Sequence, residues 1–195
     1  MTFRTRTLLA AAGLAFAVSA APVAASPTAQ ITGGYTLVEL FPEFVGALTS
    51  LGIAPSKNLP ATLHNRIALF PITGGRIDAA SAKGEIPHAG GLRLTRGGTQ
   101  VTLTDFVIDT TGTAPRLTGL VTANGSLVGR VPLFAVALPA LSLPLALPPA
   151  PEQLLIEGNR LTLTPEAATA LNGAFGVTAV APGFNVGVAS VYGTY

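Results

Sequence analysis

The sequence predicts a mainly β fold, an antiparallel β-sandwich or barrel-like domain with two short α-helices. Short segments alternate apolar and polar residues, and turn signals built on Gly, Pro and Asn recur about every 8–12 residues. A hydrophobic share of 49% with 22 Gly and 16 Pro is too apolar for a disordered tail and too interrupted for a helical bundle.

The N-terminus, residues 1–25, has the three-part pattern of a secretory signal peptide. Arg4 and Arg6 precede an apolar run over residues 8–21, and residues 23–25 offer a small-residue cleavage site. The run is shorter than the roughly 20 residues that span a bilayer, which favours cleavage over an uncleaved anchor. Cleavage leaves residues 26–195, which we interpret as a single β-rich domain that is secreted, extracellular or held in the cell envelope.

The charge of the mature chain excludes several partners. The whole chain has 11 Lys and Arg against 9 Asp and Glu, so removing Arg4 and Arg6 leaves it formally neutral. Nucleic acid binding and polybasic membrane binding both need clustered cations, so neither is expected. The absence of Cys rules out disulfides and thiolate chemistry. Pro and Gly interrupt the uncharged stretches, so no transmembrane segment is predicted after cleavage.

Two segments predict short helices, 41–53 and 164–177. Each begins with Pro-Glu, continues as an apolar run and ends at Gly, which is the usual order of helix start and stop signals. Thr164 is the predicted N-cap of the second helix. The shared pattern admits two interpretations, an internal duplication of half-motifs or two unrelated helices that start in the same common way.

The middle of the chain predicts antiparallel hairpins. Residues 91–95 and 100–104 alternate apolar and polar side chains around a Gly-Gly loop, whereas residues 105–109 break the alternation and indicate a bulge or a strand buried on both faces. Asn124-Gly125 predicts a tight turn between the strands 116–122 and 127–134. Further candidate strands are 66–72, 75–79, 153–157, 159–163 and 186–192.

The sequence offers no convincing catalytic or metal-binding set. His64 and His88 are the two histidines, and neither has metal-ligand spacing or a serine nucleophile motif nearby. Asp105 and Asp109 are four residues apart in one strand, about 13 Å, which exceeds the separation used by glycosidases. Glu85 is a third candidate carboxylate. It could approach one of the other two, although nothing in the sequence requires this. We expect Asp105 to satisfy backbone groups at the bulge and Asp109 to stabilise the following turn, and an enzyme whose carboxylates converge only in the fold is the third-ranked hypothesis.

His88 is the candidate binding residue because it lies beside glycines, just before a strand. Two roles stay open for its imidazole: a hydrogen bond to the adjacent turn, or a ligand to a metal or haem iron.

The segment from Gly84 to Val121 resembles the HtaA-domain family of surface and secreted haem-uptake proteins. The likeness rests on a Gly-rich strand with His-x-Gly-x-Leu spacing, followed by a strand that carries Asp and apolar residues. The resemblance implies a β-rich domain and haem as a cofactor, with His88 matching the family histidine. The family uses an N-terminal tyrosine as axial ligand, and Tyr35 is the early tyrosine here. Phe-Pro-Ile-Thr-Gly-Gly at 70–75 also resembles small secreted bacterial β-proteins.

The leading functional hypothesis is a secreted, non-enzymatic module of the cell envelope or extracellular space that binds an unidentified partner or has a structural role, without a cofactor. The alternative is a secreted haem-binding protein of HtaA-like type. The binding module predicts an exposed apolar patch, which we expect within residues 131–151 because repeated Leu-Pro cannot pair as a central strand.

Overall fold

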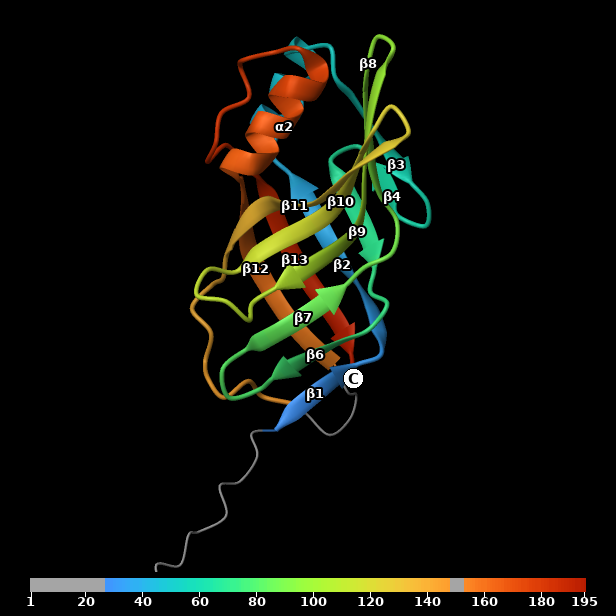
Figure 1. Cartoon of the computed structure of the whole chain (residues 1–195). Helices are drawn as coiled ribbons and strands as arrows, with labels where there is room; N and C mark the ends of the chain where they lie inside the picture. The colour runs from blue at the N-terminus through green and yellow to red at the C-terminus, as the bar shows by residue number, and fades with distance from the viewer. Residues whose placement is uncertain (1–26, 148–152) are drawn as a thin grey trace, which may run out of the picture.

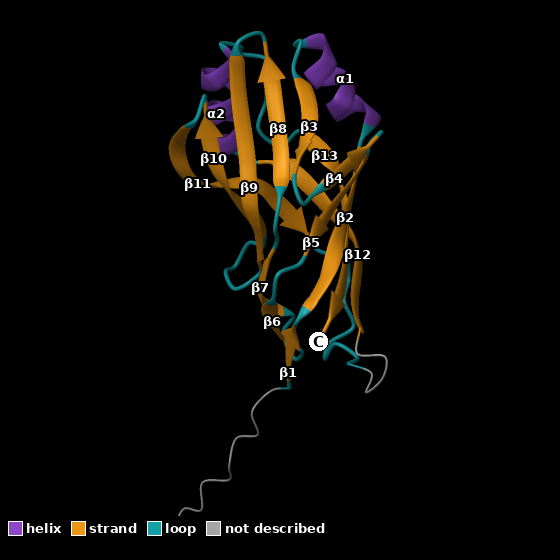
Figure 2. Cartoon of the chain, turned by 90° about the vertical axis from the view of Figure 1, so that its right-hand side faces the viewer, coloured by secondary structure: helices purple, strands orange, loops and turns teal. Residues whose placement is uncertain are grey.

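The computed structural model describes residues 27–147 and 153–195, which form a curled antiparallel sheet with two helices at one end (Figures 1 and 2). The mainly β prediction is therefore confirmed, whereas the predicted signal peptide at 1–25 lies outside the described residues. In chain order the elements are β1 Thr28–Ile31, β2 Gly33–Leu40, α1 Pro42–Ser50, β3 Ala54–Asn58, β4 Thr62–His64, β5 Ile67–Pro71, β6 Gly75–Asp78, β7 Lys83–Pro87, β8 Gly91–Arg96, β9 Thr99–Asp109, β10 Arg116–Ala123, β11 Ser126–Ala137, β12 Gln153–Leu163, α2 Pro165–Phe175 and β13 Asn185–Thr194.

Strand β9 is the branch point of the sheet. Its first part pairs with β8, which in turn pairs with β3, and its last part pairs with β7, which leads to β6 and β1. On its other side the sheet continues through β10, β11, β12, β13, β2, β5 and β4. This long second wing curls back over the first, so both wings turn their apolar faces inward and share one core.

A short seam joins the two wings where the end of β5 meets the end of β7. Ile72 and His88 form an isolated antiparallel bridge, and the backbone N–H of Ala89 donates to the carbonyl of Pro71 at 2.9 Å. The N–H of Thr73 donates to the carbonyl of Pro87 at 3.0 Å. These contacts satisfy backbone groups that an open sheet edge would leave unpaired.

The predicted hairpins form at the expected residues, and the turn residues have the expected backbone conformation. Asn124 and Gly125 have φ of 49° and 82°, the left-handed conformations that a two-residue turn needs. The predicted bulge is present as well: Asp105 has φ of 50°, and the β9–β10 register shifts opposite it. The two strands predicted at 153–157 and 159–163 are one strand, β12, because Gly158 at φ 78° bends it without ending it.

Both predicted helices are present, at the same end of the sheet (Figure 2). Thr164 caps α2 as predicted, since its Oγ1 accepts from the N–H of Ala167 at 3.1 Å. At the other end of α2, the guanidinium of Arg96 donates to the carbonyl of Phe175, so the tip of the β8–β9 hairpin holds the helix. Strands β2 and β12 lead into the two helices, and both flank β13 in the sheet. The internal duplication of the two strand–helix segments stays a prediction. No helix among the described residues is long and apolar enough to cross a bilayer.

The Leu-Pro segment takes a different place from the one expected. Over the described part of 131–151, residues 131–137 belong to β11, and Leu138, Leu141, Leu145 and Leu147 pack against the core. Among the leucines in the described part of the segment, Leu143 alone is exposed. The described part of this segment therefore covers the core and does not form the expected exposed patch.

Close backbone approach makes Gly91 a sensitive position. A Cβ at Gly91 would lie 1.8 Å from the carbonyl oxygen of Leu103 on the paired strand, whereas one at Gly98 would meet open space. We expect Gly91→Ala to lower the free energy of unfolding by about 3 kcal/mol because β8 must move away from β9. Gly98→Ala is the matched control, with an expected change below about 0.5 kcal/mol. Urea unfolding of both variants checks this, and equal stabilities would contradict it.

Candidate functional site

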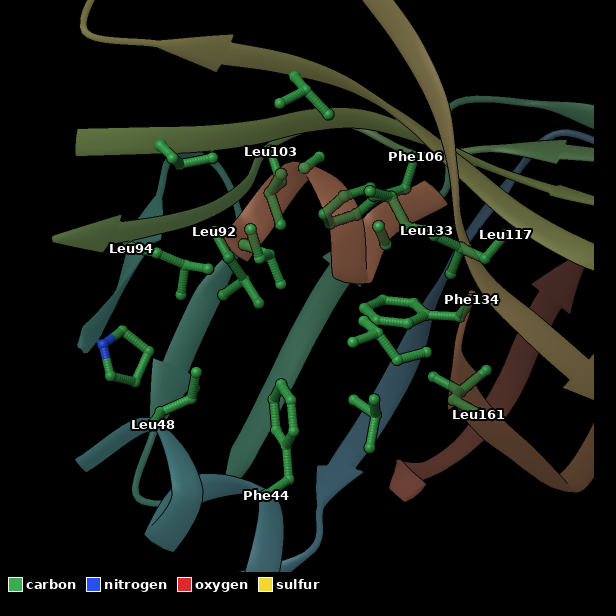
Figure 3. Close-up of a pocket in the computed structure, with 18 of the residues that line it drawn as sticks. Phe44, Leu48, Leu92, Leu94, Leu103, Phe106, Leu117, Leu133, Phe134 and Leu161 are labelled. Atoms are coloured by element: carbon green, nitrogen blue, oxygen red, sulfur yellow. The ribbon is translucent and has the colours of Figure 1, made fainter. Parts of the chain in front are cut away.

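An apolar cavity of about 280 Å³ lies between the two wings of the sheet and the two helices (Figure 3). All the side chains that line it are Val, Leu, Phe, Pro or Ala. They come from both helices and from nine strands, β2, β3, β5 and β8–β13. Phe44 and Leu48 of α1 point into this space from one side and Leu103 and Phe106 of β9 from the other (Figure 3).

The inner face of α2 explains why this space is open. Ala167, Ala170 and Ala174 line the cavity together with Leu171, and their spacing of three and four residues puts them on one face of the helix. Alanine lets the helix sit on the sheet without filling the interior. The same positions occupied by larger residues would close the cavity.

The rim of the cavity is partly exposed. Val128 lines it near the exposed start of β11, and 58% of its surface is accessible to solvent. Phe44, Pro55 and Ala170 line it and are half-buried. The cavity therefore reaches the surface at the helical end of the molecule.

An empty cavity of this size weakens a fold substantially. In enclosed cores, unfilled apolar space costs about 24 cal/mol per Å³ relative to a packed core. Net stabilities of whole domains are of the order of 5–15 kcal/mol. A protein that keeps such a space gains stability from any apolar molecule that occupies it.

His88 lies at the seam and is buried, with 4% of its surface exposed. Its Nδ1 is 3.3 Å from the carbonyl oxygen of Phe106, which can only accept, so Nδ1 carries the proton and donates. Its Nε2 therefore accepts from the hydroxyl of Thr36 at 2.7 Å. Burial lowers the pKa of His88 to about 4, against the smaller opposing effect of backbone contacts with Phe106 and Ile86. The imidazole is neutral at physiological pH, and both nitrogens are engaged.

His88 and the cavity are separate layers of the interior. Phe70 and Phe106 line the cavity and meet edge to face, with ring centroids 5.1 Å apart. Thr36 lies two residues before Val38 on the inner face of β2, and Val38 lines the cavity whereas Thr36 and His88 do not. The aromatic pair thus borders the cavity, and the His88–Thr36 pair lies outside the cavity lining.

Tyr35 lies on the other face of the sheet. Its neighbour Thr36 points inward to His88, so Tyr35 points outward, where it is 43% exposed and stacks on Tyr192 with centroids 5.0 Å apart. The hydroxyl of Tyr192 donates to Glu157 at 3.0 Å, and this hydrogen bond to a carboxylate raises the pKa of Tyr192. The structure does not bring Tyr35 and His88 together.

The candidate carboxylates divide between two places. Glu85 and Asp109 are direct cross-strand partners, and Arg76 and Arg116 flank them in the same row, so two adjacent acids lie between two bases on an outer face. Asp109 also accepts from the backbone and hydroxyl of Thr111, which lowers its pKa, and this is the turn role expected of it. Asp105 lies apart, at the bulge. Neither described pocket includes a carboxylate.

The other candidate sites hold no ligand set. His64 is exposed on the edge strand β4. Within 27–147 and 153–195, no group of three or more His, Cys, Asp or Glu side chains is placed to hold a metal ion. The cavity residues were not singled out by the sequence, because an alanine face on an amphipathic helix has the same pattern whether it covers a packed core or an open one.

The shifted pKa of His88 predicts a pH-dependent stability. The folded pKa of about 4 lies below the unfolded value of 6.5, so the unfolded chain binds a proton between these pH values and the folded chain does not. The contribution is fully present above about pH 6.5 and is lost as pH falls to 4, by about 3 kcal/mol. His88→Gln should remove this component, and His64→Gln should keep it. Urea unfolding from pH 4 to 7 measures it, and an unchanged slope in His88→Gln would contradict the assignment.

Comparison with known proteins shows which fold this is. No family model matches the sequence, and no curated protein matches it significantly. The C-terminal domain of HtaA from Corynebacterium glutamicum superposes with a TM-score of 0.63 at 16% identity, over 85% of this chain and 98% of that domain. The N-terminal domain of HtaA gives 0.62 at 13% identity, over 84% and 97%. The haem binding protein HtaB from the same organism gives 0.57 at 10% identity, over 87% and 96%. The chain has the fold of the HtaA and HtaB domains, as the resemblance implied.

Proposed function

We propose that this chain is a non-enzymatic binding protein that holds a small hydrophobic molecule in its apolar cavity, and that it acts outside the cytoplasm. The cavity carries the proposal: about 280 Å³ of space, lined by apolar side chains, is kept open in the middle of the fold. The signal-like pattern of residues 1–25 supports the location.

The lining favours binding over chemistry. It offers no acid, base or nucleophile, so nothing in it can move a proton or attack a bond. It also offers no hydrogen-bond partner from a side chain, so burying a polar group of the ligand there would cost about 1–3 kcal/mol of binding free energy. The buried part of the ligand is therefore hydrocarbon or aromatic.

Haem is the second candidate ligand, because HtaB, which has this fold, is a haem binding protein. The residues of this chain do not fit an iron ligand in the described arrangement. Both nitrogens of His88 are engaged by Phe106 and Thr36, and Tyr35 lies on the opposite face of the sheet. The cavity also has no polar side chain to meet the carboxylates of a porphyrin. The shared fold supports a binding role, and the residues support a ligand held without iron coordination.

Titration with N-phenyl-1-naphthylamine, a fluorophore that brightens in apolar surroundings, tests the cavity. We expect saturable binding of one molecule per chain. Ala170→Leu, which fills the rim side of the alanine face, should weaken binding at least tenfold. Thr169→Leu adds the same side chain on an exposed position of the same helix and should leave binding unchanged. Equal affinities in the two variants would overturn the assignment of the cavity.

Haem titration of the same proteins decides between the two ligands. The proposal expects no sharp Soret band that depends on His88. A band that is lost in His88→Gln and kept in Ala170→Leu would establish haem binding at the seam and overturn the proposal. Circular dichroism of each variant confirms that it is folded.

A further inference from the structure

We infer that the cavity takes the hydrocarbon chain of a fatty carboxylate, and that Lys57 at the rim binds its carboxylate. This inference rests on the proposed function and names the class of ligand. It requires a ligand with one apolar end that fits the cavity and one anionic end that stays outside.

The cavity fixes the chemistry of the buried end. Because the lining side chains are all apolar, the polar atoms of any ligand must remain at the rim. An engineered apolar cavity of about 150 Å³ binds benzene, so 280 Å³ accommodates roughly ten to twelve carbons on the same scale. A ligand of that length with its polar atoms at one end is a single-chain amphiphile.

The register of β3 and β8 places Lys57 beside the rim. Pro55 pairs with Leu94 and Lys57 pairs with Leu92, and Pro55, Leu92 and Leu94 all line the cavity. Side chains two residues apart on a strand, and those directly opposite across a pair, share one face. Lys57 therefore stands on the cavity face of β3, one position beyond Pro55, where it is exposed.

Lys57 is also available for an anion. Within the described residues, its ammonium has no hydrogen bond and no ion pair. The neighbouring cations of β8 are engaged: Arg93, on the other face of that strand, donates to Asn58 at 3.4 Å, and Arg96 donates to the carbonyl of Phe175. A carboxylate at the rim would pair with Lys57 without breaking an existing contact.

The test compares dodecanoate with dodecanol, which has the same chain and a neutral head. Calorimetric titration should show that Lys57→Gln weakens dodecanoate binding about threefold to fivefold, as expected of an exposed ion pair, and leaves dodecanol unchanged. Lys83→Gln removes the same charge where the lysine contacts the carbonyl of Thr111, and should change neither ligand. Raising the salt concentration should weaken dodecanoate alone.

The outcomes separate this inference from the function on which it rests. If Lys57→Gln and Lys83→Gln affect dodecanoate equally, the assignment of the head group is overturned while the cavity stands. If neither dodecanoate nor dodecanol binds but N-phenyl-1-naphthylamine does, the acyl-chain ligand is overturned and the proposed function stands. If all three fail to bind, both are overturned.

Discussion

The whole interior depends on the closure of the curled sheet at His88. A sheet that curls far enough to meet itself must satisfy polar groups where its wings touch, in a place without water. His88 does this from one position: its ring donates to β9 through Phe106, accepts from β2 through Thr36, and its backbone bridges Ile72 after β5. Phe70 is the register partner of Thr36, and its ring meets that of Phe106 edge to face at the lining of the cavity, so the same closure positions this aromatic pair.

The local elements could be predicted from the sequence because their signals are local. The Asn124-Gly125 turn, the bulge at Asp105 and the Thr164 cap each depend on a few neighbouring residues whose backbone preferences are strong. Strands β3 and β7 lack such signals. Each is short, contains proline, and becomes a strand only because β8 or β9 supplies its partner. The expected exposure of the Leu-Pro segment failed for a related reason, since its leucines cover a core that the sequence alone does not place.

The candidate site shows where sequence reasoning stops. His88 was identifiable as an unusual residue, but its contacts reach 52 residues back to Thr36 and 18 forward to Phe106, beyond any local pattern. A strand assigned over 33–40 would have placed Tyr35 and Thr36 on opposite faces. The cavity left no such trace, because a lining of leucine, phenylalanine and alanine is also the composition of a filled core.

The contact between Arg96 and the carbonyl of Phe175 has a mechanical consequence. It ties the tip of the β8–β9 hairpin, which forms one wall of the cavity, to the end of α2, which forms another. The Arg96 bond is charge-assisted and adds to the packing of α2 on β11 and β9, while the Thr164 hydroxyl bonds the start of the helix to the carbonyl of Pro132 in β11. The helix is thus bonded at its start through Thr164 and at its end through Arg96, so both ends of this cavity wall have a fixed place against the sheet.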